Sequence, residues 1–113
     1  MAWQPARDHV IQTLGAVAAD GQSASFNVAC TKLYVKCQIT AIGAGESVQF
    51  FLEGQDPGDS QWYPLAQGDV LAAAGTSVVA LDFPPSDALR VRWDVTTADD
   101  ITFGVRAVEV GGG

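Results

Sequence analysis

The chain has 113 residues, the length of a single domain, and 48% of them are hydrophobic, which excludes an intrinsically disordered protein. Thirteen Asp and Glu against six Lys and Arg give a net charge of −7, which excludes binding to a nucleic-acid backbone. No apolar run approaches the roughly 18 residues of a membrane span, so we expect a soluble protein with no membrane partner.

The chain begins with an aperiodic segment. Residues 1–9 mix a tryptophan, a proline and charged side chains without regular spacing, and they lack the apolar stretch of a signal peptide. This pattern predicts synthesis in the cytoplasm and an extended N-terminal arm that lies along the domain or along a neighbouring molecule. The candidate partner-binding residues of the arm are Trp3, Gln4, Arg7 and His9.

Apolar and polar residues alternate with a period of two from about residue 23 to residue 110, which is typical of half-buried strands. The stretch 69–74 resembles a helix, but it is too short and glycines bracket it. Turns recur at intervals of roughly 8 to 12 residues. The predicted strands include residues 25–30, 33–40, 48–53, 61–65, 77–83, 88–96 and 101–110.

These features predict one all-β domain over residues 10–110. Short strands at this spacing favour a two-sheet antiparallel β-sandwich of jelly-roll type with about eight strands. An immunoglobulin-like order of the same strands is the alternative. The three glycines at 111–113 predict a flexible tail.

Cys30 and Cys37 belong to consecutive predicted strands, with a tight turn expected at Thr31-Lys32. In that register the cysteines are offset by about 13 Å along the strands, beyond the ~7 Å Cα separation that a disulfide allows. The single histidine, His9, lies far upstream, so a zinc site is not expected. We predict two reduced, buried cysteines, as in proteins of the cytoplasm.

The sequence Asp56-Pro57-Gly58-Asp59 places Pro and Gly at the central positions of a predicted type II turn. Pro64 then places the following short strand at a sheet edge. Trp62 and Tyr63 are neighbours in this strand, so one of them must face outward. An exposed aromatic side chain beside a loop serves as an interface anchor or as a platform for a sugar, so both residues are candidates for partner binding.

Residues 88–96 and 101–110 alternate most clearly, and Ala98-Asp99-Asp100 between them predicts an antiparallel hairpin. Trp93 falls in the apolar stripe and is expected in the core. Arg90, Arg92 and Arg106 fall on the opposite, solvent-facing side. They either offset an acidic surface through weak exposed ion pairs or form a docking patch, because arginine is enriched at protein interfaces.

Catalytic motifs are absent from the sequence: it has no phosphate-binding loop, no dinucleotide fingerprint and no zinc-protease motif. His9 lies in the predicted arm, a poor place for a general base. The aspartates fall in turns, where their side chains bond the local backbone. Glu53, Asp56 and Asp59 are too few oxygen ligands for calcium. We therefore expect no enzymatic activity, no cofactor and no metal.

Two segments carry a resemblance: VQFFLEGQDPGDSQWYPLAQGD (48–69) and LRVRWDVTTADDITFGVRAVEV (89–110). They resemble small β-sandwich proteins of tailed bacteriophage particles, notably capsid decoration and head-stabilising proteins. The matching features are Glu53-Gly54, the loop 56–58, Trp62 and the RVRWDVT stretch at 90–96. Pro57 departs from the Asp-Gly step that is usual in this loop.

The resemblance implies a non-enzymatic virion protein, made in the host cytoplasm, that binds the major capsid protein or another virion protein at the capsid surface. It also implies a homo-oligomer, with a trimer favoured. The alternative is a carbohydrate- or receptor-binding sandwich module of a tail or fibre, in which Trp62 and Tyr63 stack on a sugar ring.

Overall fold

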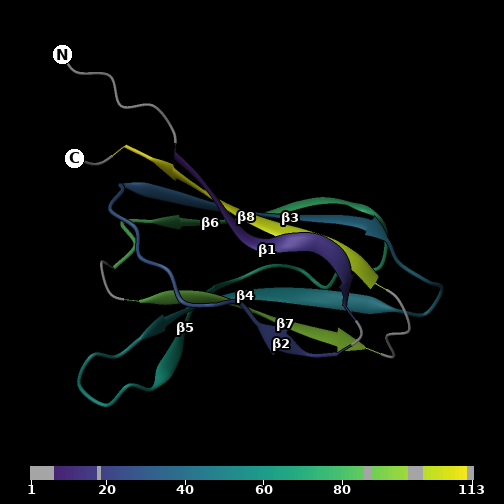
Figure 1. Ribbon diagram of the computed structural model, residues 1–113, viewed down its shortest axis with the longest axis horizontal. Helices are drawn as coiled ribbons and strands as arrows, with labels where there is room; N and C mark the ends of the chain where they lie inside the picture. The colour runs from purple at the N-terminus through teal and green to yellow at the C-terminus, as the bar shows by residue number, and fades with distance from the viewer. Residues whose placement is uncertain (1–6, 18, 86–87, 97–100, 112–113) are drawn as a thin grey trace.

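The computed structural model describes residues 7–17, 19–85, 88–96 and 101–111. Within these ranges the chain forms eight strands and no helix, in two layers that lie face to face (Figure 1). The described residues therefore contain no helix that could cross a membrane. The strands are β1 (Arg7–Val17), β2 (Gly21–Gln22), β3 (Lys32–Ala41), β4 (Ser47–Gln55), β5 (Trp62–Gln67), β6 (Gly75–Asp82), β7 (Leu89–Thr96) and β8 (Ile101–Val110).

The strand order is that of a jelly roll. Sheet A has the order β1-β8-β3-β6 and sheet B has the order β2-β7-β4-β5, with antiparallel pairing throughout. The first strand therefore pairs with the last, the second with the seventh, the third with the sixth and the fourth with the fifth. This nested pairing characterises the double-sheet jelly roll. The predicted fold class is confirmed, and the immunoglobulin-like order is wrong.

The inward side chains of the two sheets form one core. Phe103 of β8 is fully buried, and its ring contacts two aromatic rings of the opposite sheet. The ring centroids of Phe50 and Trp93 lie 4.9 Å and 5.3 Å from it, both in edge-to-face geometry. The prediction that Trp93 lies in the core is confirmed. The other buried apolar residues are Val28, Leu33, Val35, Cys37, Ile39, Val48, Leu52, Val79, Leu89, Val91, Ile101, Val105 and Ala107.

Strand β1 does not follow the period-two alternation of apolar and polar residues. Its pairing with β8 shifts register on both sides of Gln12, and each such bulge changes which side chains face the core. The strand also begins at Arg7, so Arg7–His9, predicted as the end of the arm, are paired residues of sheet A. Residues 1–6, with the candidates Trp3 and Gln4, lie outside the described residues.

The strand predicted for residues 25–30 is wrong. This segment connects β2 in sheet B with β3 in sheet A, and its contact with a strand is an isolated bridge between Phe26 and Leu89. A chain that crosses from one layer to the other leaves the ladder of either sheet. The apolar–polar alternation of residues 25–30 arises because Val28 is buried at the end of the sandwich while Asn27 and Ala29 on either side of it are exposed.

Cys30 and Cys37 are not joined by a disulfide, as predicted. Cys37 is buried in β3, but Cys30 is half-buried, because it lies in the connection between the sheets. The tight turn expected at Thr31-Lys32 is absent, since Lys32 already pairs with β6 and β8.

Burial of Cys37 makes the stability of the protein sensitive to alkaline pH. Burial raises the pKa of the Cys37 thiol from 9.0 to about 12, so between these values the folded chain keeps a proton that the unfolded chain has lost. Stability then falls as pH rises through this window, by up to about 1.4 kcal/mol per pH unit. In urea titrations, the stability difference between the wild type and Cys37→Ala should shrink between about pH 8 and about pH 11. Cys30→Ala is the control, and parallel curves for Cys37→Ala and the wild type would contradict the effect.

The hairpin predicted for residues 88–110 is wrong. Strand β7 belongs to sheet B and β8 to sheet A, so the chain crosses between the layers instead of turning back within one sheet. Alternation defines the inward and outward faces of each strand, but it does not specify which strand lies beside it. As a consequence, Arg90 and Arg92 lie on the outer face of one sheet, whereas Arg106 lies on the outer face of the other.

The turn between β4 and β5 has a different type from the one predicted. The positive φ belongs to Ser60, at 61°, and not to Gly58. The amide of Ser60 donates to the carbonyl of Asp56 at 2.8 Å, and the amide of Gly58 donates to the carboxylate of Asp56 at 2.7 Å. The turn itself is confirmed, but the type II assignment is wrong because the left-handed position falls two residues later.

Candidate interaction surface

The outer face of sheet B carries a row of charged and aromatic side chains. Every second residue of a strand points outward, so Phe51 and Glu53 of β4 and Arg90 and Arg92 of β7 share this face. The strand register places Phe51 opposite Arg92 and Glu53 opposite Arg90. The neighbouring strand β5 adds Trp62 at its start.

Glu53 organises the row. The residue is 9% exposed, and its two carboxylate oxygens accept hydrogen bonds from Nε of Arg90 at 2.8 Å and Nε of Arg92 at 3.3 Å. Arg92 also donates from Nη1 to Asp94 at 2.6 Å. Partial burial opposes the charge of Arg92, but the hydrogen bonds and charges of Asp94 and Glu53 outweigh it and raise the pKa of this guanidinium. Charge-assisted bonds of this kind fix both arginines in place.

Each arginine stacks on an aromatic ring. The guanidinium carbon of Arg90 lies 4.3 Å from the centre of the Trp62 ring, and that of Arg92 lies 4.1 Å from the centre of the Phe51 ring. These contacts have cation–π geometry. The side chains thus form one continuous series, Trp62, Arg90, Glu53, Arg92 and Phe51, which we call the Arg–aromatic row. Tryptophan and arginine are the residue types that most often dominate protein interfaces, and in this row their side chains are held by contacts within the sheet.

The row unites three of the nine candidates predicted from the sequence, Trp62, Arg90 and Arg92. Tyr63 lies on the other side of β5, where a Cβ added to Gly54 would come within 3.0 Å of its ring. Arg106 lies on sheet A and forms an ion pair with Asp8. The remaining candidates in the described chain belong to β1, namely Arg7, by its backbone alone, and His9.

His9 binds a buried carboxylate. Glu109 of β8 is 4% exposed, and its side chain contacts Nε2 of His9 and accepts the amide of Ala29 at 2.8 Å. These two contacts of Glu109 link β1 and the connection before β3 to β8. Among the described residues, no three His, Cys, Asp or Glu side chains form a group that could hold a metal ion.

Phe83 is an exposed aromatic residue that the sequence pattern does not reveal. It follows β6, is 79% exposed and has a φ of 50°, a rare and strained backbone conformation for a bulky residue. The carbonyl of Thr31 accepts its amide at 2.8 Å and holds the turn. The apolar–polar alternation places residue 83 at the end of a strand. The sequence feature that could have predicted a turn at Phe83 is the following Pro84-Pro85, which prevents the strand from continuing.

No protein-family model and no curated protein sequence matches the chain. Solved structures do share its fold. The SPBc2 prophage-derived protein YomS has a TM-score of 0.59 and 13% identity, with 98% of this chain and 99% of that chain covered. A chain from the structure of infectious bursal disease virus has a TM-score of 0.51 and 13% identity, with 99% of this chain and 35% of that chain covered.

A third similar structure contains the CBM22-1 and GH10 modules of Clostridium thermocellum xylanase 10B in complex with xylohexaose. Its TM-score is 0.53 and its identity 12%, with 81% of this chain and 19% of that chain covered. At such identities the likeness concerns the fold alone. The chain is thus a two-sheet β-sandwich, and its fold is similar to parts or the whole of a prophage-derived protein, a chain of infectious bursal disease virus and a xylanase chain.

Proposed function

We propose that the chain is a non-enzymatic structural protein of a tailed-phage particle, a decoration or cementing protein that binds the major capsid lattice. The observation that carries the proposal is the match to a prophage-derived protein across nearly the full length of both chains. The neighbour from infectious bursal disease virus supports a particle component. A trimeric assembly belongs to the same proposal and rests on the sequence resemblance.

The surface of the molecule fits such a role. A cementing protein needs a rigid body and a few anchors that bury apolar or stacked side chains against the lattice. The jelly roll is the body. Phe83 is the most exposed of the large apolar side chains described. Its amide donates to the carbonyl of Thr31, and the amide of Thr31 donates to the carbonyl of Val110, so Phe83 lies at the end of the sandwich where β1 begins and β8 ends. Residues 1–6 precede β1 in the chain and would add Trp3 as a further anchor.

The Arg–aromatic row argues against the carbohydrate-binding alternative. A sugar ring stacks on the open face of an aromatic side chain, but one face of Trp62 already carries the guanidinium of Arg90. Glu53 holds that guanidinium through a hydrogen bond of 2.8 Å. A sugar on this face would have to displace a charged group from a partly buried ion pair, so the virion role is the better proposal.

Co-sedimentation with undecorated capsids of the phage that encodes the chain tests the proposal. We expect the wild type to pellet with the capsids and Phe83→Ala to bind at least about tenfold more weakly, as is typical when an aromatic hot spot is truncated. Val70→Ala, which truncates an exposed apolar residue of the β5–β6 connection, is the control and should bind normally. A wild-type chain that stays in the supernatant at every salt concentration would overturn the function. Normal binding by Phe83→Ala would remove that residue from the interface.

A further inference from the structure

Two cationic residues occupy neighbouring strands on the outer face of sheet A. Lys36 of β3 lies directly opposite Arg106 of β8 in the strand register, and like charges in this position repel. Asp8 neutralises Arg106. Among the side chains that the structure describes, Lys36 is the one Lys or Arg without an ion pair, in a chain with a net charge of −7. The others pair as Lys32–Asp82, Arg90–Glu53, Arg92–Glu53, Arg92–Asp94 and Arg106–Asp8.

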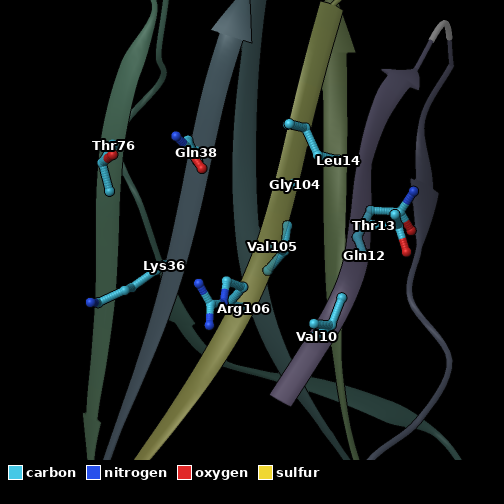
Figure 2. A pocket seen from close by; sticks show the side chains of 10 residues that line it. All are labelled: Val10, Gln12, Thr13, Leu14, Lys36, Gln38, Thr76, Gly104, Val105 and Arg106. Carbon is cyan, nitrogen blue, oxygen red and sulfur yellow. The ribbon is translucent and has the colours of Figure 1, made fainter. Parts of the chain in front are cut away.

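The two cations line a hollow of about 460 Å³ (Figure 2). One wall is apolar, because Val10 and Leu14 of β1 are 68% and 52% exposed. The bulge in β1 builds this wall by passing close over β8: a Cβ added to Gly104 would lie 3.1 Å from the Cα of Leu14. Gln38 and Thr76 continue the lining along β3 and β6.

Such a hollow fits an acidic turn. A carboxylate would neutralise the unpaired charge of Lys36, and a small apolar side chain would cover Val10 and Leu14. The chain itself displays this chemistry in the loop Asp56-Pro57-Gly58-Asp59, whose four residues are all exposed and which projects from the sandwich between β4 and β5 (Figure 1).

The acidic side chains of this loop are fixed in place. One oxygen of Asp56 accepts the amide of Gly58 at 2.7 Å, and one oxygen of Asp59 accepts the amide of Gln61 at 2.9 Å. The second oxygen of each carboxylate has no bond to any described residue, and it is available to a cation of another molecule. Pro57 supplies an apolar surface between the two acids.

We propose that the protein self-associates head to tail, with the loop Asp56–Asp59 of one copy in the hollow of the next copy and its carboxylates against Lys36 and Arg106. The loop and the hollow are different surfaces, so the contact is heterologous and produces a closed ring or a filament. The contact needs no capsid, so the inference goes beyond the proposed function and does not depend on it.

Charge exchange tests the contact. In sedimentation velocity, Lys36→Glu and Asp59→Lys should each weaken self-association at least about tenfold, and adding about 1 M NaCl should weaken it in the wild type. The double variant carrying Lys36→Glu and Asp59→Lys exchanges the charges and should restore most of the association. Asp69→Lys is the matched control, because it makes the same charge change at an exposed aspartate outside the loop, and it should associate normally.

Every outcome of these measurements either supports or overturns the inference. A wild-type chain that is monomeric up to millimolar concentration, an oligomer that ignores both single changes, or a double variant that fails to recover would overturn the inference. Thermal melts of every variant separate weakened association from misfolding, and recovery in the double variant requires both halves to be folded. Capsid binding measured on Lys36→Glu keeps the two proposals apart: if a non-associating variant still binds the capsid, the proposed capsid binding stands without this contact.

Discussion

Replacing Phe103 with alanine is expected to lower the free energy of unfolding by about 3–5 kcal/mol, the range for truncating a fully buried aromatic side chain. Phe103 is 0% exposed, and its ring lies 4.9 Å from Phe50 and 5.3 Å from Trp93. Truncation removes both edge-to-face contacts between the sheets and leaves a cavity that rigid β-strands cannot close. A small domain is stable by only about 5–15 kcal/mol, so the loss is a large fraction of the total.

Urea denaturation measures this effect, and Phe83→Ala provides the control. It is the same substitution at an aromatic residue that is largely exposed, and it should change stability by no more than about 0.5 kcal/mol. A loss below about 1.5 kcal/mol for Phe103→Ala would mean that Phe103 does not hold the two sheets together.

Glu53→Ala is expected to cost about 2 kcal/mol of unfolding free energy. Removing one member of a buried ion pair costs about 3–5 kcal/mol because it strands the other charge. Here the arginine side chains are 18% and 32% exposed, so water screens part of the penalty. Without Glu53, Arg90 and Arg92 lie side by side on β7 with no shared counter-charge, and their stacking on Trp62 and Phe51 should loosen.

Asp94→Ala is the matched control for Glu53→Ala. It removes the other carboxylate of Arg92, but that carboxylate is exposed, so the loss should be about 0.5 kcal/mol or less. Trp62 fluorescence should shift in Glu53→Ala and stay unchanged in Asp94→Ala, which reports the stacking directly. Equal losses in both variants would show that Glu53 does not organise the row.

The predictable part of the fold is the part with a regular period. Strands β3 and β7 alternate without interruption, and the burial pattern of β8 is interrupted at Gly104, so the buried apolar residues of these strands, including Trp93, follow from the sequence. Strand β1 could not be predicted because its two register shifts move side chains between faces. The placement of β7 and β8 in different sheets depends on contacts between strands far apart in the chain, and alternation carries no such information.

One part of the Arg–aromatic row could likewise be predicted from the sequence, and another part could not. The outward orientation of Arg90 and Arg92 is readable from the alternation in their strand. The same rule requires one of Trp62 and Tyr63 to face outward without specifying which. The assembly of the row around Glu53 is not readable, because it requires the register of β4 against β7 and the position of β5 beside them. Phe83 owes its exposure to a left-handed backbone conformation, which belongs to the tertiary structure and has no counterpart in a period-two pattern.

The most direct test of the central claim is mass spectrometry of purified particles released from cells that encode the chain. If the jelly roll is a virion component, its tryptic peptides should accompany the major capsid protein through density-gradient purification, in a constant ratio across the particle band. If the chain is abundant in the lysate but missing from the particle band, it is not a virion protein.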